Sequence, residues 1–71
     1  MRWGSAPARR VLKSLLKIGW RVERVRGSHQ VLVRPGWTPY VFAFHADEEI
    51  GPVMLARIAK RTGLQPEDLG R

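Results

Sequence analysis

Two histidines and a set of arginines are the side chains of this 71-residue sequence that could do chemistry. His29 follows Gly27 and Ser28, and the second histidine is His45. Histidine has an unperturbed pKa of about 6.5, which suits proton transfer near neutral pH. Glycine permits a sharp turn and a close approach of a ligand, and Ser28 can donate a hydrogen bond. A lone histidine at the end of a strand is more often structural or merely exposed, so a catalytic role has to be argued from the residues around it.

Two histidines near arginines fit the cleavage of RNA without a metal ion. One group takes the proton of the ribose 2′-hydroxyl, another protonates the leaving oxygen, and arginine or lysine stabilises charge on the phosphate. DNA lacks that hydroxyl and cannot react by this route. A metal site is the competing use, but it would depend on two histidines and acidic residues of a separate segment. The sequence has no nucleophile motif of a serine hydrolase.

The positions of the two histidines predict that they lie together. The segment from Pro35 to Pro39 is a loop centred on Trp37, so a symmetric hairpin pairs residues whose numbers sum to 74, as those of His29 and His45 do. Directly opposed residues share one face of a sheet, with Cβ atoms about 4.5–5.5 Å apart. A one-residue bulge would separate the two histidines, so their pairing is a prediction of the register.

The charge of the chain indicates the kind of partner. Thirteen Lys or Arg residues and six Asp or Glu residues give a net charge of +7. The basic residues are spread from Arg2 to Arg71, so the positive field belongs to the folded surface and favours a polyanion. Nucleic acid is favoured over anionic lipid, because lipid-binding helices normally carry bulky aromatic residues on their apolar face. An acidic protein is the third candidate.

Length and composition limit the class of protein. A chain of 71 residues makes one domain with a small core, which buries only roughly 60% of the unfolded surface. The absence of cysteine excludes disulfides and thiolate metal sites and suits a reducing compartment. The longest apolar runs fall far short of the roughly 20 residues of a membrane helix, and no signal peptide is evident. We therefore expect a cytoplasmic protein.

Two helices and three strands must position these side chains. Apolar residues at helical spacing predict a first helix, which Gly19 ends, and a second helix, which ends at Thr62-Gly63. The apolar residues of the first are Val11, Leu12, Leu15 and Leu16, and those of the second are Met54, Leu55, Ile58 and Ala59. Strands are predicted at 20–26, 29–34 and 40–44, with Phe42 and Phe44 in the core. The order α-β-β-β-α predicts an α+β fold in which both helices cover one face of an antiparallel sheet. The other face stays open to a partner.

The ordered set of features resembles a known family. The residues that carry the resemblance span about positions 8 to 69 and are Gly19-Trp20, Arg24, Gly27-Ser28-His29, His45 and Thr62-Gly63-Leu64. They resemble the HicA (YcfA-like) toxins, small mRNA interferases of HicBA toxin–antitoxin systems. The resemblance implies a double-stranded-RNA-binding-domain-like fold, ribonuclease activity that depends on His29, and a HicB antitoxin that covers this histidine.

The sequence therefore predicts a metal-independent endoribonuclease toxin that cleaves mRNA and is inhibited by a HicB-like antitoxin. His29 is the predicted general acid or base, and His45 is a second candidate through the hairpin register. The predicted RNA-binding residues are Lys13, Lys17, Arg21, Arg24, Arg26 and Ser28. We expect one domain over residues 8–71 after an extension at 1–7, and no cofactor, metal or membrane partner. Two interpretations stay open: a non-catalytic RNA-binding module of the same fold, and a domain that mainly docks an acidic protein.

Overall fold

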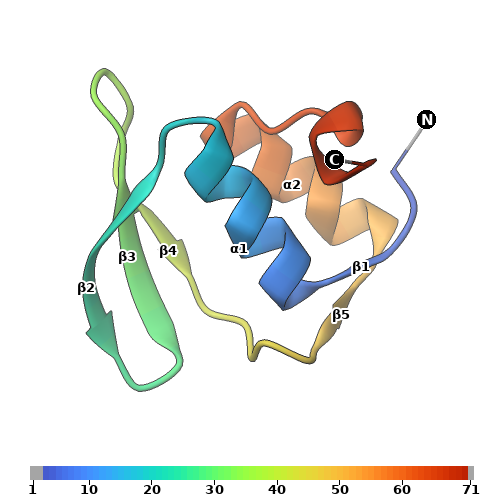
Figure 1. Ribbon diagram of the computed structural model, residues 1–71, viewed down its shortest axis with the longest axis horizontal. Coiled ribbons are helices and arrows are strands. Elements are labelled where there is room, and N and C mark those ends of the chain that lie inside the picture. The colour runs from blue at the N-terminus through green and yellow to red at the C-terminus, as the bar shows by residue number, and fades with distance from the viewer. Residues whose placement is uncertain (1–2, 71) are drawn as a thin grey trace.

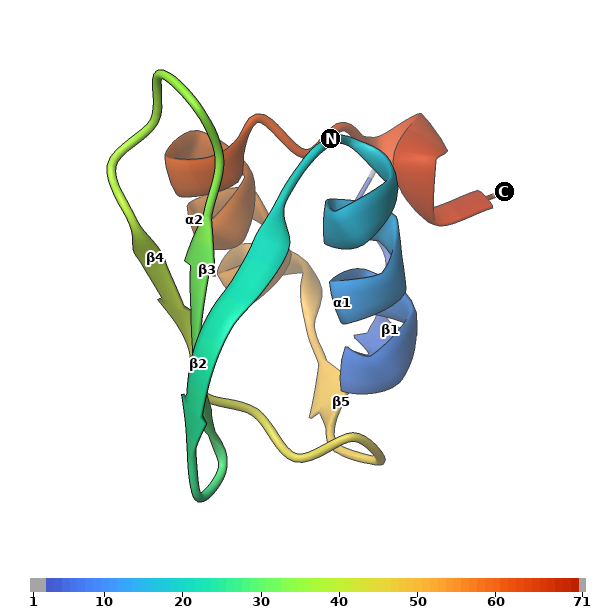
Figure 2. The same cartoon turned by 60° about the vertical axis from the view of Figure 1, so that its left-hand side comes forward.

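A computed structural model describes residues 3–70 of the chain. The elements follow in the order β1 (Ala6–Pro7), α1 (Ala8–Lys17), β2 (Arg21–Arg26), β3 (His29–Val33), β4 (Tyr40–Phe42), β5 (Glu49–Ile50), α2 (Pro52–Thr62) and a 3₁₀ turn, η1 (Pro66–Gly70). Strands β2, β3 and β4 form an antiparallel sheet, and Figure 1 and Figure 2 show both helices on one side of it. The expected α+β fold is confirmed, and this arrangement is compatible with a double-stranded-RNA-binding-domain-like fold.

Glycine and proline set the bounds of the helices. Pro7 precedes α1 with φ −68°, a value that its ring imposes, and Pro52 opens α2. Gly63 ends α2 in the left-handed conformation, and its N–H donates to the carbonyl of Ala59 at 2.9 Å. Within residues 3–70, no helix is long and apolar enough to cross a membrane.

The core lies between the helices and the sheet. Its largest fully buried side chains include Phe42 and Leu32 from the sheet and Leu15, Leu55 and Ile58 from the helices. Phe42 lies in the core, as the sequence predicts. Phe44 is partly buried at the edge of the core and packs against Phe42, with ring centroids 5.2 Å apart. Burial of these side chains is the main favourable term that holds the two layers together.

The predicted register of the hairpin between β3 and β4 is wrong. The observed pairs are Gln30 with Phe42, Val31 with Val41 and Leu32 with Tyr40, so the residue numbers sum to 72 rather than 74. The loop begins with a tight turn in which the N–H of Trp37 donates to the carbonyl of Arg34 at 3.0 Å. Pro35 and Gly36 occupy its centre, and Gly36 has the positive φ, 85°, that a type II turn requires there. The hairpin is therefore centred on residue 36 and not on residue 37.

A second, two-stranded sheet was not expected from the sequence. Ala6 of β1 pairs with Ile50 of β5, and both side chains are buried. Two further backbone bonds extend this contact, from the N–H of Ala8 to Glu48 and from that of Arg9 to Ala46. The segment before α1 is thereby tied to the segment before α2. The domain boundary expected at residue 8 stays a prediction. Residues 1 and 2 of the expected extension and residue 71 of the expected domain lie outside the described residues.

Candidate functional site

His29 stands at the start of β3, directly after the turn formed by Gly27 and Ser28. Gly27 has φ 58°, in the left-handed region that glycine adopts at little cost. The turn brings Arg26, the last residue of β2, directly opposite His29. Opposed residues of an antiparallel pair project on the same face, so the imidazole and the guanidinium leave the sheet on one side. Both residues are exposed.

The side of the sheet that carries His29 is the one that the helices leave open. Gln30 pairs with the buried Phe42, which places both on the helix side. Successive side chains of a strand alternate between faces, so His29 and Val31 lie on the other side. Arg24 pairs with Val31 and therefore joins them. We call this surface of β2, β3 and β4 the open face.

A bulge in β2 adds a third arginine to the open face. The pairing shifts by one residue between Val22 and Arg24, so Glu23 has no single partner on β3. Val22 then pairs with Leu32 on the helix side, and Arg21 pairs with Val33 on the open face. Without the bulge, strict alternation would reverse these two faces. Three of the predicted RNA-binding residues therefore share one face with His29.

The other predicted RNA-binding residues lie elsewhere. Lys13 and Lys17 belong to α1, in the layer behind the sheet, and are not on the open face. Ser28 is half-buried in the turn between β2 and β3, next to His29 in the chain. The structure thus places His29, Arg26, Arg24 and Arg21 on one face, with Arg26 opposite His29 and Arg21 four residues along β3 from it. The two lysines lie on a separate basic surface.

His45 is not the cross-strand partner of His29. Continuing the observed register places Ala43 opposite His29, so His45 lies two residues further along the chain. It is exposed in the segment between β4 and β5, where the N–H of His45 donates to Glu48 Oε1 at 3.1 Å. The N–H of Glu48 returns a bond to the carbonyl of His45 at 3.0 Å. Within residues 3–70, no group of three or more His, Cys, Asp or Glu residues is placed to hold a metal ion.

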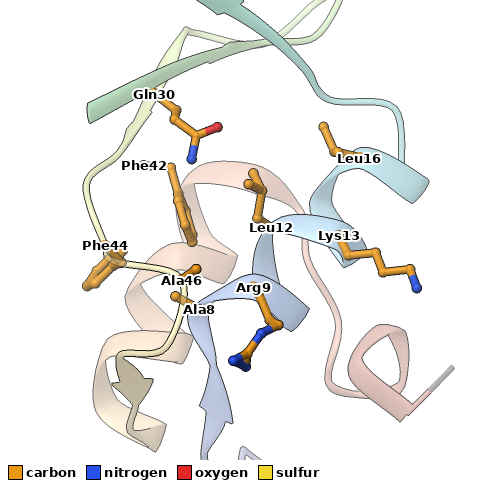
Figure 3. A pocket seen from close by; sticks show the side chains of 9 residues that line it. All are labelled: Ala8, Arg9, Leu12, Lys13, Leu16, Gln30, Phe42, Phe44 and Ala46. Atoms are coloured by element: carbon orange, nitrogen blue, oxygen red, sulfur yellow. The ribbon is translucent and has the colours of Figure 1, made fainter. Parts of the chain in front are cut away.

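Behind the strand of His29 lies a groove, which we call the α1 groove (Figure 3). It has a volume of about 220 Å³ and is lined by Ala8, Arg9, Leu12, Lys13, Leu16, Gln30, Phe42, Phe44 and Ala46. The lining is mainly apolar. Gln30 reaches into the groove from β3, and the Lys13 side chain extends outward at its edge (Figure 3).

A basic cleft between α2 and β4 was not assigned a role from the sequence. It is lined by Tyr40, Arg57, Lys60 and Arg61. Partial burial raises the pKa of Tyr40 above its ordinary value, an effect that the nearby charge of Arg61 opposes. The phenol is therefore protonated at neutral pH and can donate a hydrogen bond. The spacing of the three cations on one helix face was visible in the sequence, but the approach of Tyr40 depends on the register of β4.

One comparison with known proteins identifies a family. A family model described as "HicA toxin of bacterial toxin-antitoxin" matches residues 8–64. No curated protein and no solved structure matches the chain. The matched region runs from the first residue of α1 to just past α2, and so includes the open face with His29 and its arginines.

Proposed function

The chain belongs to the HicA toxin family of bacterial toxin–antitoxin systems, and from this premise we propose that it is a metal-independent endoribonuclease that cleaves mRNA. The observation that carries the proposal is the pair of His29 and Arg26 on the open face. An exposed imidazole directly opposite a guanidinium offers a proton-transfer group beside a phosphate-binding group. Arg24 and Arg21 extend the same positive face along the strand.

The proposed reaction breaks the P–O5′ bond of RNA. His29 takes the proton of the 2′-hydroxyl, whose oxygen attacks phosphorus, or gives a proton to the leaving 5′-oxygen. Arg26 stabilises the charge that develops on the phosphate oxygens. The products are a 2′,3′-cyclic phosphate and a 5′-hydroxyl. His45 is the candidate for the second proton transfer, because its segment leaves the sheet at the end where β3 begins.

Binding of the RNA chain precedes this reaction. Arg21 and Arg24 are proposed to hold phosphates on the open face, with Ser28 helping to position the scissile phosphate or His29. Lys13 and Lys17 of α1 add long-range attraction for the backbone. Because these contacts are to phosphates, sequence preference should be weak.

Membership in the family gives the chain an antitoxin partner. We propose that this partner is a HicB-like protein and that it covers the open face, including His29. Coverage of His29 would block the 2′-hydroxyl from reaching the imidazole and so inhibit cleavage without any change in the toxin's fold.

Product analysis tests the proposed function. The purified chain is incubated with RNA and with DNA of the same sequence, each in EDTA, and the ends of the products are identified. The proposal predicts cleavage of RNA alone, with 2′,3′-cyclic phosphate and 5′-hydroxyl ends. Cleavage that stops in EDTA, or that leaves 5′-phosphate ends, would point to water activated by a metal. RNA that is bound but left intact would make the chain a non-catalytic RNA-binding module.

A further inference from the structure

The α1 groove lies between helix α1 and the sheet, where both α1 and the edge strand β2 expose apolar side chains to solvent. The core face of α1 is formed by Ala8, Val11 and Leu15, which are buried, whereas Leu16 is 42% exposed. Leu12 and Leu16, one turn apart, form a second apolar stripe on α1 that lines the groove; Leu12 is half-buried against the edge of the core, and Leu16 lies outside it. An apolar surface that extends beyond the core in this way marks a binding surface.

The helix side of β2 continues this apolar surface. Val22 pairs with Leu32 and Val25 pairs with Gln30, so both valines project toward the helices. They nevertheless remain 37% and 59% exposed, since no helix covers them. Val25 lies beside Gln30, which itself lines the groove. The apolar surface therefore runs from α1 across the groove to the edge strand.

The rim of the groove is positive. Arg9 and Lys13 line it from α1, four residues apart and both exposed, and no carboxylate is among its lining residues. A polypeptide that complements this rim would therefore carry acidic residues on either side of the apolar side chain that enters the groove. Fully buried apolar anchors surrounded by polar and charged rims are the usual arrangement at protein–protein interfaces.

The same features distinguish a protein occupant from a nucleotide. A base that is read in a pocket is held by hydrogen bonds to its edge and by stacking on an exposed aromatic face. In this groove Gln30 is the one uncharged polar side chain. Of its two aromatic rings, Phe42 is only 1% exposed and Phe44 is half-buried against it, with the two rings edge to face. The volume of about 220 Å³ lies below the roughly 300–1,000 Å³ of small-molecule pockets and suits one apolar side chain.

We propose that the α1 groove is an anchoring site for the antitoxin, which inserts one apolar side chain, flanked by acidic residues, between α1 and the β2–β3 hairpin. The inference rests on the proposed function for the identity of the partner. Gln30 in the groove and His29 on the open face are consecutive residues of β3, so a partner held in the groove stands at the edge of the catalytic face. Anchoring at the groove and coverage of His29 are thus parts of one interface.

Replacement of Leu16 tests the site. Leu16→Gln places another good helix former of similar size at this position and removes the apolar contact. Val53→Gln is the matched control, because Val53 is 69% exposed on α2, a different surface. Each variant is titrated by calorimetry with the purified antitoxin encoded beside the gene of the toxin. We expect the Kd of Leu16→Gln to rise at least about tenfold and that of Val53→Gln to stay within about twofold.

Two further measurements keep the test decisive. Val25→Gln, on β2 beside the groove residue Gln30, should weaken antitoxin binding in the same direction as Leu16→Gln. Thermal unfolding of each variant checks that it is folded. RNA cleavage by Leu16→Gln should match that of the wild type. If antitoxin affinity is unchanged, or if only RNA affinity falls, the groove does not anchor the antitoxin. Calorimetry measures antitoxin affinity directly and requires no RNA cleavage. The result therefore still tests the groove if the ribonuclease proposal fails.

Discussion

At the scale of the residue, the account depends on which side chains share a face with His29. Arg26 is its cross-strand partner, and Arg24 follows on the same face. Arg21 joins them only because of the bulge at Glu23. Lysines on α1 carry the same charge but stand on another layer, so in the proposed reaction they add attraction for RNA without contacting the scissile phosphate. Position relative to the sheet, and not charge alone, assigns the roles.

Removal of Arg26 tests that assignment. Arg26→Ala should lower the rate of RNA cleavage by on the order of 10²-fold, because a group that stabilises charge in the transition state is lost. It should also reduce the slope of log affinity against log salt by about 0.7, the value of one phosphate contact to single-stranded RNA. Lys60→Ala removes the same charge from α2, away from the open face. It should leave the rate of cleavage unchanged and lower the salt slope only slightly, through the general positive field. Equal effects of the two variants would show that the open face has no special role.

At the scale of the element, one aromatic cluster holds the ends of the layers together. Trp20, between α1 and β2, donates from Nε1 to the carbonyl of Thr62 at 3.0 Å. Its ring meets Trp37 of the β3–β4 loop edge to face, with centroids 5.9 Å apart, and Arg34 stacks over Trp37 at 5.3 Å. The cluster connects the end of α2 to the hairpin that carries His29. It therefore fixes the sheet against the helices at the end away from the turn that precedes His29.

Glycine 63 lies against this cluster and gives a prediction for stability. Gly63 has φ 79°, and a Cβ there would come within 2.9 Å of the Trp37 ring. Gly36 has a similar φ, 85°, but open space around it. Gly36→Ala should thus lower the free energy of unfolding by roughly 1–2 kcal/mol, the backbone cost of a left-handed residue. Gly63→Ala should lower it by clearly more, measured by chemical denaturation. Equal losses would mean that Trp37 moves aside without cost.

At the scale of the whole molecule, the charge is spread over several surfaces. Basic side chains occupy the open face, the exposed side of α1 and the cleft between α2 and β4. Such a field favours any polyanion over most of the surface, so charge alone does not define a binding site. In our proposals, two local features on either side of β3 define the binding sites: the histidine on the open face and the apolar groove behind it.

The order of the two helices and the three main strands, and the turn that precedes His29, were predictable because they depend on local patterns. Helical spacing and the Gly-Ser-His turn are properties of neighbouring residues. The register of the β3–β4 hairpin was not predictable from loop symmetry, since the tight turn at Pro35 and Gly36 shifts its centre by one residue. The bulge at Glu23 and the two-residue pairing of β1 with β5 leave no periodic signal. The partial exposure of Leu16 depends on how α1 sits against the sheet.

The most direct test of the central claim is single-turnover cleavage of RNA by His29→Ala, with RNA affinity measured on the same preparation. Loss of a general acid or base predicts a rate lower by on the order of 10²- to 10⁴-fold, with the Kd for RNA within a few-fold of the wild-type value. His45→Ala, measured beside it, shows whether the second histidine shares the proton transfers. Cleavage by His29→Ala at the wild-type rate, with both proteins folded, would contradict the account.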